Sequence, residues 1–145
     1  MRLVVSRCLA LCIGSLLPLA ELYRRSHQLG DIAVLPAWID DVLIGAFLLY
    51  GAWRTRGGRE DGRIHLAAAW AFMAGMAYGS FFGQLEELDQ ADPSGASPLI
   101  IVGIKGAGLV IAIVCLWLTA GSLVSRQLPP TSAARPSGRS DRLLP

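Results

Sequence analysis

Four long stretches of mostly apolar residues alternate with short polar connections along the chain. They run approximately over residues 3–22, 32–53, 64–85 and 99–124. A run of about 20 apolar residues is long enough to cross the hydrocarbon core of a bilayer, which is about 30 Å thick. Each run is expected to be helical, because lipid offers no hydrogen-bond partner to a bare backbone amide. The pattern therefore predicts four transmembrane helices.

The connections between these runs are short, so neighbouring helices must run antiparallel. We expect one domain over residues 1–125, an all-α integral membrane bundle of four helices with up-down topology. No small-residue cleavage pattern follows the first run, which we interpret as an uncleaved helix. The last segment, residues 126–145, is rich in Pro, Ser and Arg. It is expected to be a disordered basic tail in the cytoplasm.

Composition supports the membrane interpretation. The 145 residues are 53 % hydrophobic and only 17 % charged, whereas about a quarter of the residues of a soluble domain are charged. The arginines cluster at the N-terminus, in the second connection and in the tail, three regions that share one side of a four-span protein. Basic residues mark the cytoplasmic side. We therefore expect a multi-pass protein of a bacterial-type inner membrane, with both termini cytoplasmic, a lipid bilayer as partner and no nucleic acid.

Small residues form a ridge on the third run. Ala71, Gly75, Gly79 and Gly83 follow one another at four-residue spacing and share one face of a helix. Helices in lipid associate through close backbone approach, so such ridges mark contacts. The ridge predicts packing within the bundle or, alternatively, a seam for a homo-oligomer or a larger membrane complex.

Three ionisable residues stand within the apolar runs: Asp40, Asp41 and Lys105. A charge at the centre of a membrane helix costs about 2.5–3.5 kcal/mol on insertion scales, so such residues normally face the bundle. Counting at 1.5 Å per residue places Asp40 ~12 Å, Lys105 ~9 Å and Tyr78 ~10 Å below the outer surface. Gln84, together with Glu21 and Glu86, is expected at the mouth above them.

This chemistry has two interpretations. Neighbouring carboxylates in a low dielectric resist joint ionisation, so a cluster of Asp40, Asp41, Tyr78 and Lys105 suits the binding or passage of a proton, a cation or a small polar ligand. Alternatively, Pro36 opens the helix near Ala37. The two aspartates then lie at headgroup level, and Lys105 reaches outward along its long stem.

Other chemistry is poorly supported. His27 and His65 are expected about 30 Å apart, a membrane thickness, and so do not share a metal or haem. Cys8, Cys12 and Cys115 form no zinc motif. We expect no catalytic residues, metal or cofactor. The leading hypothesis is a non-enzymatic ligand- or proton-binding membrane protein. The alternatives are an accessory subunit that docks a partner through the glycine ridge and, less favoured, a membrane enzyme acting on lipid or quinone.

Overall fold

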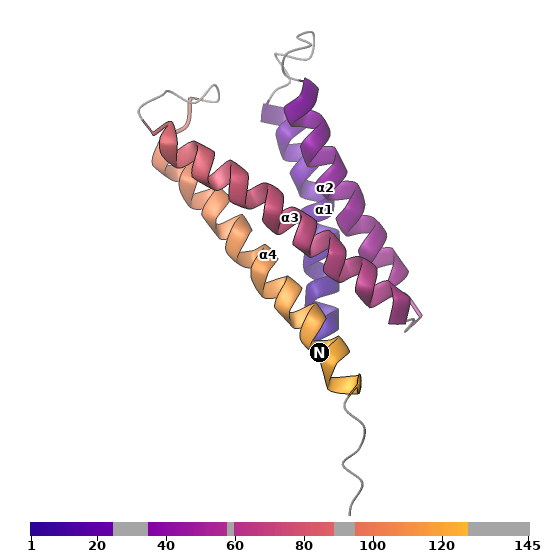
Figure 1. Cartoon of the computed structure of the whole chain (residues 1–145). Coiled ribbons are helices and arrows are strands. Elements are labelled where there is room, and N and C mark those ends of the chain that lie inside the picture. Colours follow the sequence, from indigo (N-terminus) through magenta and orange to yellow (C-terminus); the bar gives the residue numbers. More distant parts are fainter. Residues whose placement is uncertain (25–34, 58–59, 89–94, 128–145) are drawn as a thin grey trace, which may run out of the picture.

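Four α-helices make up the computed structural model (Figure 1), which describes residues 1–24, 35–57, 60–88 and 95–127. The helices are α1 (Arg2–Arg24), α2 (Leu35–Arg54), α3 (Glu60–Glu86) and α4 (Pro98–Gln127). No strand occurs among these residues. The prediction of an all-helical fold with four helices is therefore confirmed.

Prolines mark the beginnings of two helices. Pro36 stands in the first turn of α2, and Pro98 is the first residue of α4. Proline is tolerated there because the first N–H groups of a helix have no acceptor within it. The carbonyl of Ser97 accepts hydrogen bonds from the backbone N–H groups of Ile100 and Ile101 at 2.9 and 3.3 Å. At its other end α4 continues to Gln127, so it includes the first two residues of the expected tail. The remainder of that tail lies outside the described residues.

The helices form two antiparallel pairs. Helix α1 lies along α2, and α3 lies along α4, while α2 also packs on α3 and α1 more lightly on α4. Figure 1 shows the N-terminus and the end of α4 at the same end of the molecule, and the two pairs diverging toward the opposite end. We call these the N-terminal end and the open end.

Three helices are long and apolar enough to cross a membrane. The qualifying segments are Arg2–Tyr23, Asp61–Glu86 and Pro98–Gly121. Their large apolar side chains mostly point away from the bundle: Val110 is 60 % exposed and Trp117 is 65 % exposed. Contiguous apolar surface of this kind is rare on soluble monomers and marks contact with lipid or protein. The chain is therefore identified as a membrane protein.

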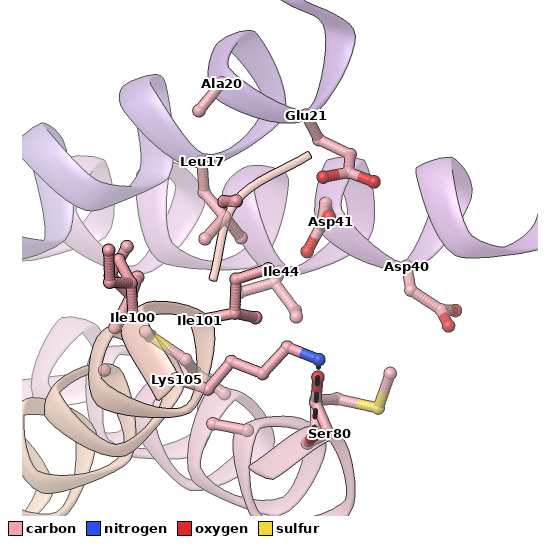
Figure 2. Close-up of a pocket in the computed structure, with 16 residues that line it drawn as sticks. Leu17, Ala20, Glu21, Asp40, Asp41, Ile44, Ser80, Ile100, Ile101 and Lys105 are labelled. Atoms are coloured by element: carbon pink, nitrogen blue, oxygen red, sulfur yellow. Dashed lines mark hydrogen bonds between the residues drawn. The ribbon is translucent and has the colours of Figure 1, made fainter. Parts of the chain in front are cut away.

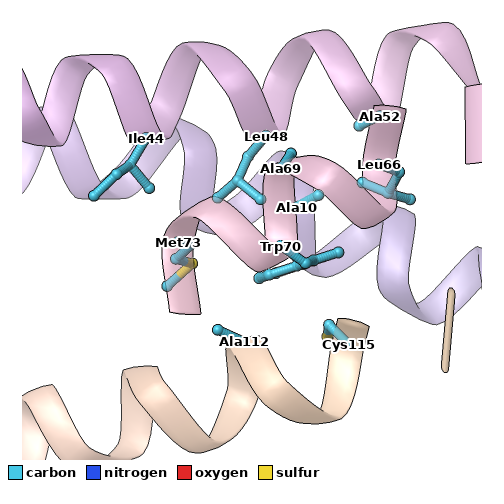
Figure 3. Close-up of a cluster of buried hydrophobic side chains, with 10 residues drawn as sticks. All are labelled: Ala10, Ile44, Leu48, Ala52, Leu66, Ala69, Trp70, Met73, Ala112 and Cys115. Atoms are coloured by element: carbon cyan, nitrogen blue, oxygen red, sulfur yellow. The ribbon is translucent and has the colours of Figure 1, made fainter. Parts of the chain in front are cut away.

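The core lies where the two pairs meet. Trp70 on α3 is the largest fully buried side chain, and it packs among small and aliphatic residues from all four helices (Figure 3). These neighbours are Ala10, Ile44, Leu48, Ala52, Leu66, Ala69, Met73, Ala112 and Cys115. The large indole thus fills the space between the pairs.

A buried chain of hydrogen bonds runs through this core. The indole Nε1–H of Trp70 donates to Ser6 Oγ at 2.8 Å, and Ser6 Oγ lies 2.8 Å from Thr119 Oγ1. Thr119 uses its own hydroxyl hydrogen on the backbone carbonyl of Cys115, at 2.7 Å. Ser6 is therefore the donor to Thr119, and each of these donated hydrogens has an acceptor. The hydrogen-bond network joins α1, α3 and α4.

Glycines allow α2 to lie close to both α1 and α3. A Cβ added at Gly45 on α2 would lie 2.7 Å from the Gly14 carbonyl oxygen of α1, and one added at Gly51 would lie 2.9 Å from Leu66 Cα of α3. Both distances are shorter than a side chain allows. At these two positions the absence of a side chain therefore sets how closely α2 approaches its neighbours.

The glycine ridge of α3 does not make such contacts. A Cβ added at Gly75, Gly79 or Gly83 would meet no atom within 4 Å in the described part of the chain. Ala71, the fourth member, is also exposed. The ridge therefore lies on an open face of α3, and the close helix contacts within the chain use other glycines.

Candidate functional site

A cavity of about 540 Å³ lies between the two helix pairs toward the open end. All four helices contribute to its wall. Its ionisable lining residues are Glu21, Asp40, Asp41 and Lys105, and its larger apolar ones include Ile44, Met73, Met76, Ile101 and Ile104. The cavity is thus a mixed site, with charged and apolar surfaces, of a size typical for small-molecule binding.

The two aspartates occupy the second turn of α2. Asp41 is half-buried and Asp40 is exposed, and both line the cavity. Adjacent residues on a helix point about 100° apart, so one carboxyl group turns further into the bundle than the other. Figure 2 shows Asp41 beside the cavity and Asp40 farther along its rim.

Glu21 contributes a third carboxyl group, from α1. Its side chain is only 8 % exposed, and it projects from the last turns of α1 toward the same side as Asp41 (Figure 2). The sequence predicts this residue at the mouth of the site, and in the structure it lines the cavity near the open end. The sequence signal was available: Glu21 continues, at helical spacing, the face on which Ser6, Ala10 and Gly14 are buried.

Lys105 enters the cavity from α4. Its Nζ donates to Gln84 Oε1 at 2.8 Å and to the Ser80 carbonyl oxygen at 3.4 Å, so α3 supplies both acceptors. The side chain is half-buried and does not simply extend outward along the helix surface. Gly106 beside it allows the two helices to approach, since an added Cβ would lie 3.0 Å from Phe81 Cε2.

The positive and negative groups come from opposite walls. Glu21 and the two aspartates belong to the α1–α2 pair, whereas the Lys105 ammonium lies along the α3–α4 pair (Figure 2). Asp40, Asp41, Lys105 and Gln84 are thus brought to one end of the bundle, from three different helices. The acidic and basic residues that line the described part of the cavity thus belong to different helix pairs.

Tyr78 does not join this cluster. It is not among the residues that line the cavity; its ring is 58 % exposed and packs on Phe82 with 4.5 Å between ring centroids. Tyr78 has the depth expected for the site, but it lies two residues from Ser80. Two helical residues separated in this way point to nearly opposite faces, so Tyr78 faces away from the cavity that Ser80 lines.

The other polar candidates lie elsewhere. His65 Nδ1 is 2.6 Å from the Asp61 carbonyl oxygen, and its ring meets Tyr50 edge-on with 5.5 Å between centroids. His27 lies outside the described residues. Cys8, Cys12 and Cys115 are all free thiols, and only Cys115 is buried. Among the described residues, no group of three His, Cys, Asp or Glu side chains is arranged to hold a metal ion.

Comparisons with protein-family models, with curated proteins and with solved structures find no match to this chain. The case for a function therefore rests on the cavity and on the charges around it.

Proposed function

We propose that this chain is a four-span membrane protein that binds a small cation, or a small ligand carrying positive charge, in the cavity at its open end. The observation that carries the proposal is the excess of acidic groups there. Three carboxyl side chains and one ammonium side chain line the described part of the cavity. A proton shared between carboxylates is the smallest cation that such a site can hold.

The membrane topology is the first element of the proposal. Helix α2 has 20 residues, which at 1.5 Å per residue give about 30 Å, the thickness of a hydrocarbon core. Arginines gather at the N-terminal end of the molecule: Arg2, Arg7, Arg54, Arg56 and Arg63. The preference for basic residues in the cytoplasm then assigns that end, with both chain termini, to the cytoplasm. The cavity consequently opens toward the outer side.

Cation binding follows from the electrostatics of the cavity. Ionisable residues within membrane segments are costly and normally mark ligand or ion sites. A cleft that carries mainly one sign of charge between low-dielectric walls attracts ions of the opposite sign. Here the carboxyl groups of α1 and α2 supply that field, while Gln84 and Ser80 hold the Lys105 ammonium on α3.

Thermal unfolding in detergent tests this function. A ligand that binds only the folded protein raises the unfolding temperature, with a gain of about 2.7 kcal/mol at 100 times its Kd. The panel comprises the chlorides of sodium, potassium, ammonium, tetramethylammonium and benzyltrimethylammonium. We expect at least one cation to raise the unfolding temperature of the parent protein, and this shift to disappear in Asp41→Asn and Glu21→Gln.

Asp61→Asn is the matched control, because it removes the same charge at an exposed position on the first turns of α3. It should keep the full cation-induced shift. If no cation of the panel stabilises the parent, or if Asp41→Asn and Glu21→Gln both keep the shift, the proposed function is wrong.

The open glycine ridge favours a second candidate, a subunit that docks a helix of another membrane protein. An added Cβ at Gly75, Gly79 or Gly83 meets nothing in the described chain, so a second helix has room to approach closely. Gly79→Leu should abolish co-purification of the partner from membranes, whereas Gly103→Leu, at an equally open position on α4, should not. Co-purification that survives Gly79→Leu contradicts docking at this ridge.

A further inference from the structure

The cavity changes character along its depth. Glu21, Asp41 and Lys105 lie toward the open end, whereas Ile44 and Met73 lie about one to two helical turns further inward on their helices. From Ser80 to Met73 the wall descends seven residues of α3, about 10 Å. Met73 is 5 % exposed and belongs to the hydrophobic core. The cavity thus has a charged rim on α1 and α2 and an apolar floor below it, whereas on α4 the apolar Ile100 and Ile101 lie nearer the open end than Lys105.

The apolar floor is larger than an inorganic ion requires. The cavity volume of about 540 Å³ falls within the range of roughly 300–1,000 Å³ for small-molecule pockets. Ile44, Met73 and Met76 supply aliphatic and thioether surface to this floor. A bare ion makes no favourable contact with such surface, whereas removal of apolar ligand surface from water favours binding. Methionine adapts its shape to different apolar groups.

The positions of the charges at the rim indicate which end of a ligand is charged, and with what sign. The Lys105 ammonium already donates to Gln84 Oε1 at 2.8 Å, on the α3 side. The carboxyl groups of Glu21 and Asp41 lie on the α1–α2 side (Figure 2). A positive group is attracted to these carboxylates. An anionic group on the same ligand would face their repulsion and would compete with Gln84 for Lys105.

From this arrangement we infer that the cavity binds an amphipathic organic cation. Its positive group lies between Glu21 and Asp41, and its apolar body rests on Met73, Met76 and Ile44. The inference deepens the proposed function and rests on it, because it specifies which class of cation the site prefers.

Isothermal titration calorimetry on the full chain in detergent micelles tests the inference with four probes. Benzyltrimethylammonium combines a cation with an apolar ring, and sodium lacks the body. Glycine betaine adds a carboxylate to the same trimethylammonium group, and benzyl alcohol keeps the ring without the charge. We expect benzyltrimethylammonium to bind at least tenfold more tightly than each of the other three.

Two kinds of variant test the contacts of the two parts of the ligand, its charged group and its apolar body. Asp41→Asn and Glu21→Gln should each weaken benzyltrimethylammonium binding tenfold or more, whereas Asp61→Asn and Glu86→Gln, exposed carboxyl groups outside the cavity wall, should leave it unchanged. Met76→Ala should weaken benzyltrimethylammonium binding threefold or more and leave any sodium binding unchanged. Circular dichroism of each variant shows whether the helices are intact, and the second carboxyl variant carries the test if one fails to fold.

The outcomes distinguish a failure of this inference from a failure of the proposed function. Sodium bound as tightly as benzyltrimethylammonium, with loss in Asp41→Asn, overturns the inference and leaves the proposed cation site standing. Tighter binding of glycine betaine overturns the inference in favour of a zwitterion, and tighter binding of benzyl alcohol overturns it in favour of a neutral apolar ligand. Failure of every probe to bind in a carboxyl-dependent manner contradicts both the inference and the proposed function.

Discussion

Ser6 on α1 donates its hydroxyl hydrogen to Thr119 on α4 across 2.8 Å, although 113 residues separate the two in the sequence. Both side chains are fully buried, and Trp70 of α3 donates to the same serine. Together these two contacts join α1, α3 and α4 toward the N-terminal end of the molecule. The cavity lies toward the other end, where the helix pairs diverge (Figure 1). The helices are thus joined by buried hydrogen bonds toward one end of the molecule and enclose a cavity toward the other.

Thr119→Val is expected to destabilise the folded protein by about 1 kcal/mol, a typical value for a hydrogen bond between helices in a membrane. The substitution keeps the side-chain shape but removes the acceptor of the Ser6 hydroxyl. Unfolding in mixed micelles with increasing dodecyl sulfate, followed by circular dichroism, measures the change. Thr55→Val is the control, because the buried Thr55 hydroxyl, directly after α2, donates to the Ala52 carbonyl three residues earlier and so makes a local hydrogen bond. Equal effects of the two variants would show that the contact between helices adds nothing.

Gly45→Ala is expected to destabilise the fold by about 1–3 kcal/mol, the usual cost of overpacking. The new Cβ would lie 2.7 Å from the Gly14 carbonyl oxygen and 2.9 Å from Pro18 Cγ, so α1 and α2 must separate. The same unfolding titration checks it. Gly79→Ala is the matched control, because its Cβ meets nothing within 4 Å in the described chain and alanine favours helices by up to about 1 kcal/mol over glycine. A stability loss in Gly79→Ala as large as in Gly45→Ala would contradict the assigned helix contacts.

The sequence predicted the depth of the site residues in the bundle, but it did not predict how each helix is rotated about its axis. The common depth of Asp40, Asp41 and Lys105 follows from counting residues from helix ends, and these three residues do line one cavity. The face of Tyr78 does not follow from such counting. In lipid the exposed surface of α3 is as apolar as its buried surface, so hydrophobicity does not indicate which way the helix is rotated.

Glycine contacts have the same limitation. The regular stripe of Gly75, Gly79 and Gly83 is the most conspicuous small-residue pattern, yet close approaches occur at other glycines, among them Gly45 and Gly51. A small residue shows where a helix can approach another, but it does not identify the neighbour. Only the three-dimensional structure shows that Gly14 meets Gly45 and that the α3 stripe remains open.

Lys105→Met is expected to tighten the binding of a cationic probe by roughly threefold to tenfold, because it removes a like charge from the cavity wall. The sign is opposite to that expected for Asp41→Asn, although both variants remove one charge. Calorimetric titration with benzyltrimethylammonium measures the difference. Arg56→Met, which removes an exposed positive charge at the N-terminal end, should not change the affinity. Weaker binding in Lys105→Met would indicate that Lys105 itself contacts an anionic part of the ligand.

Reporter fusions test the orientation in the membrane. Green fluorescent protein, which folds in the cytoplasm, should fluoresce when fused within residues 55–57, and alkaline phosphatase should be inactive there. Phosphatase fused at Glu87 or Leu88 should be active, because that end of α3 is expected outside. Phosphatase activity at residues 55–57 would reverse the map and place the cavity on the cytoplasmic side.

The most direct test of the account is a crystal structure of the full chain grown with 4-bromobenzyltrimethylammonium. The bromine atom scatters anomalously and marks the apolar end of the bound cation. We predict a single strong bromine peak next to Met73 and Met76, with the trimethylammonium group between Glu21 and Asp41. A bromine peak only on the lipid-facing surface, with the cavity holding none of the cation, would contradict the claim that this cavity binds it.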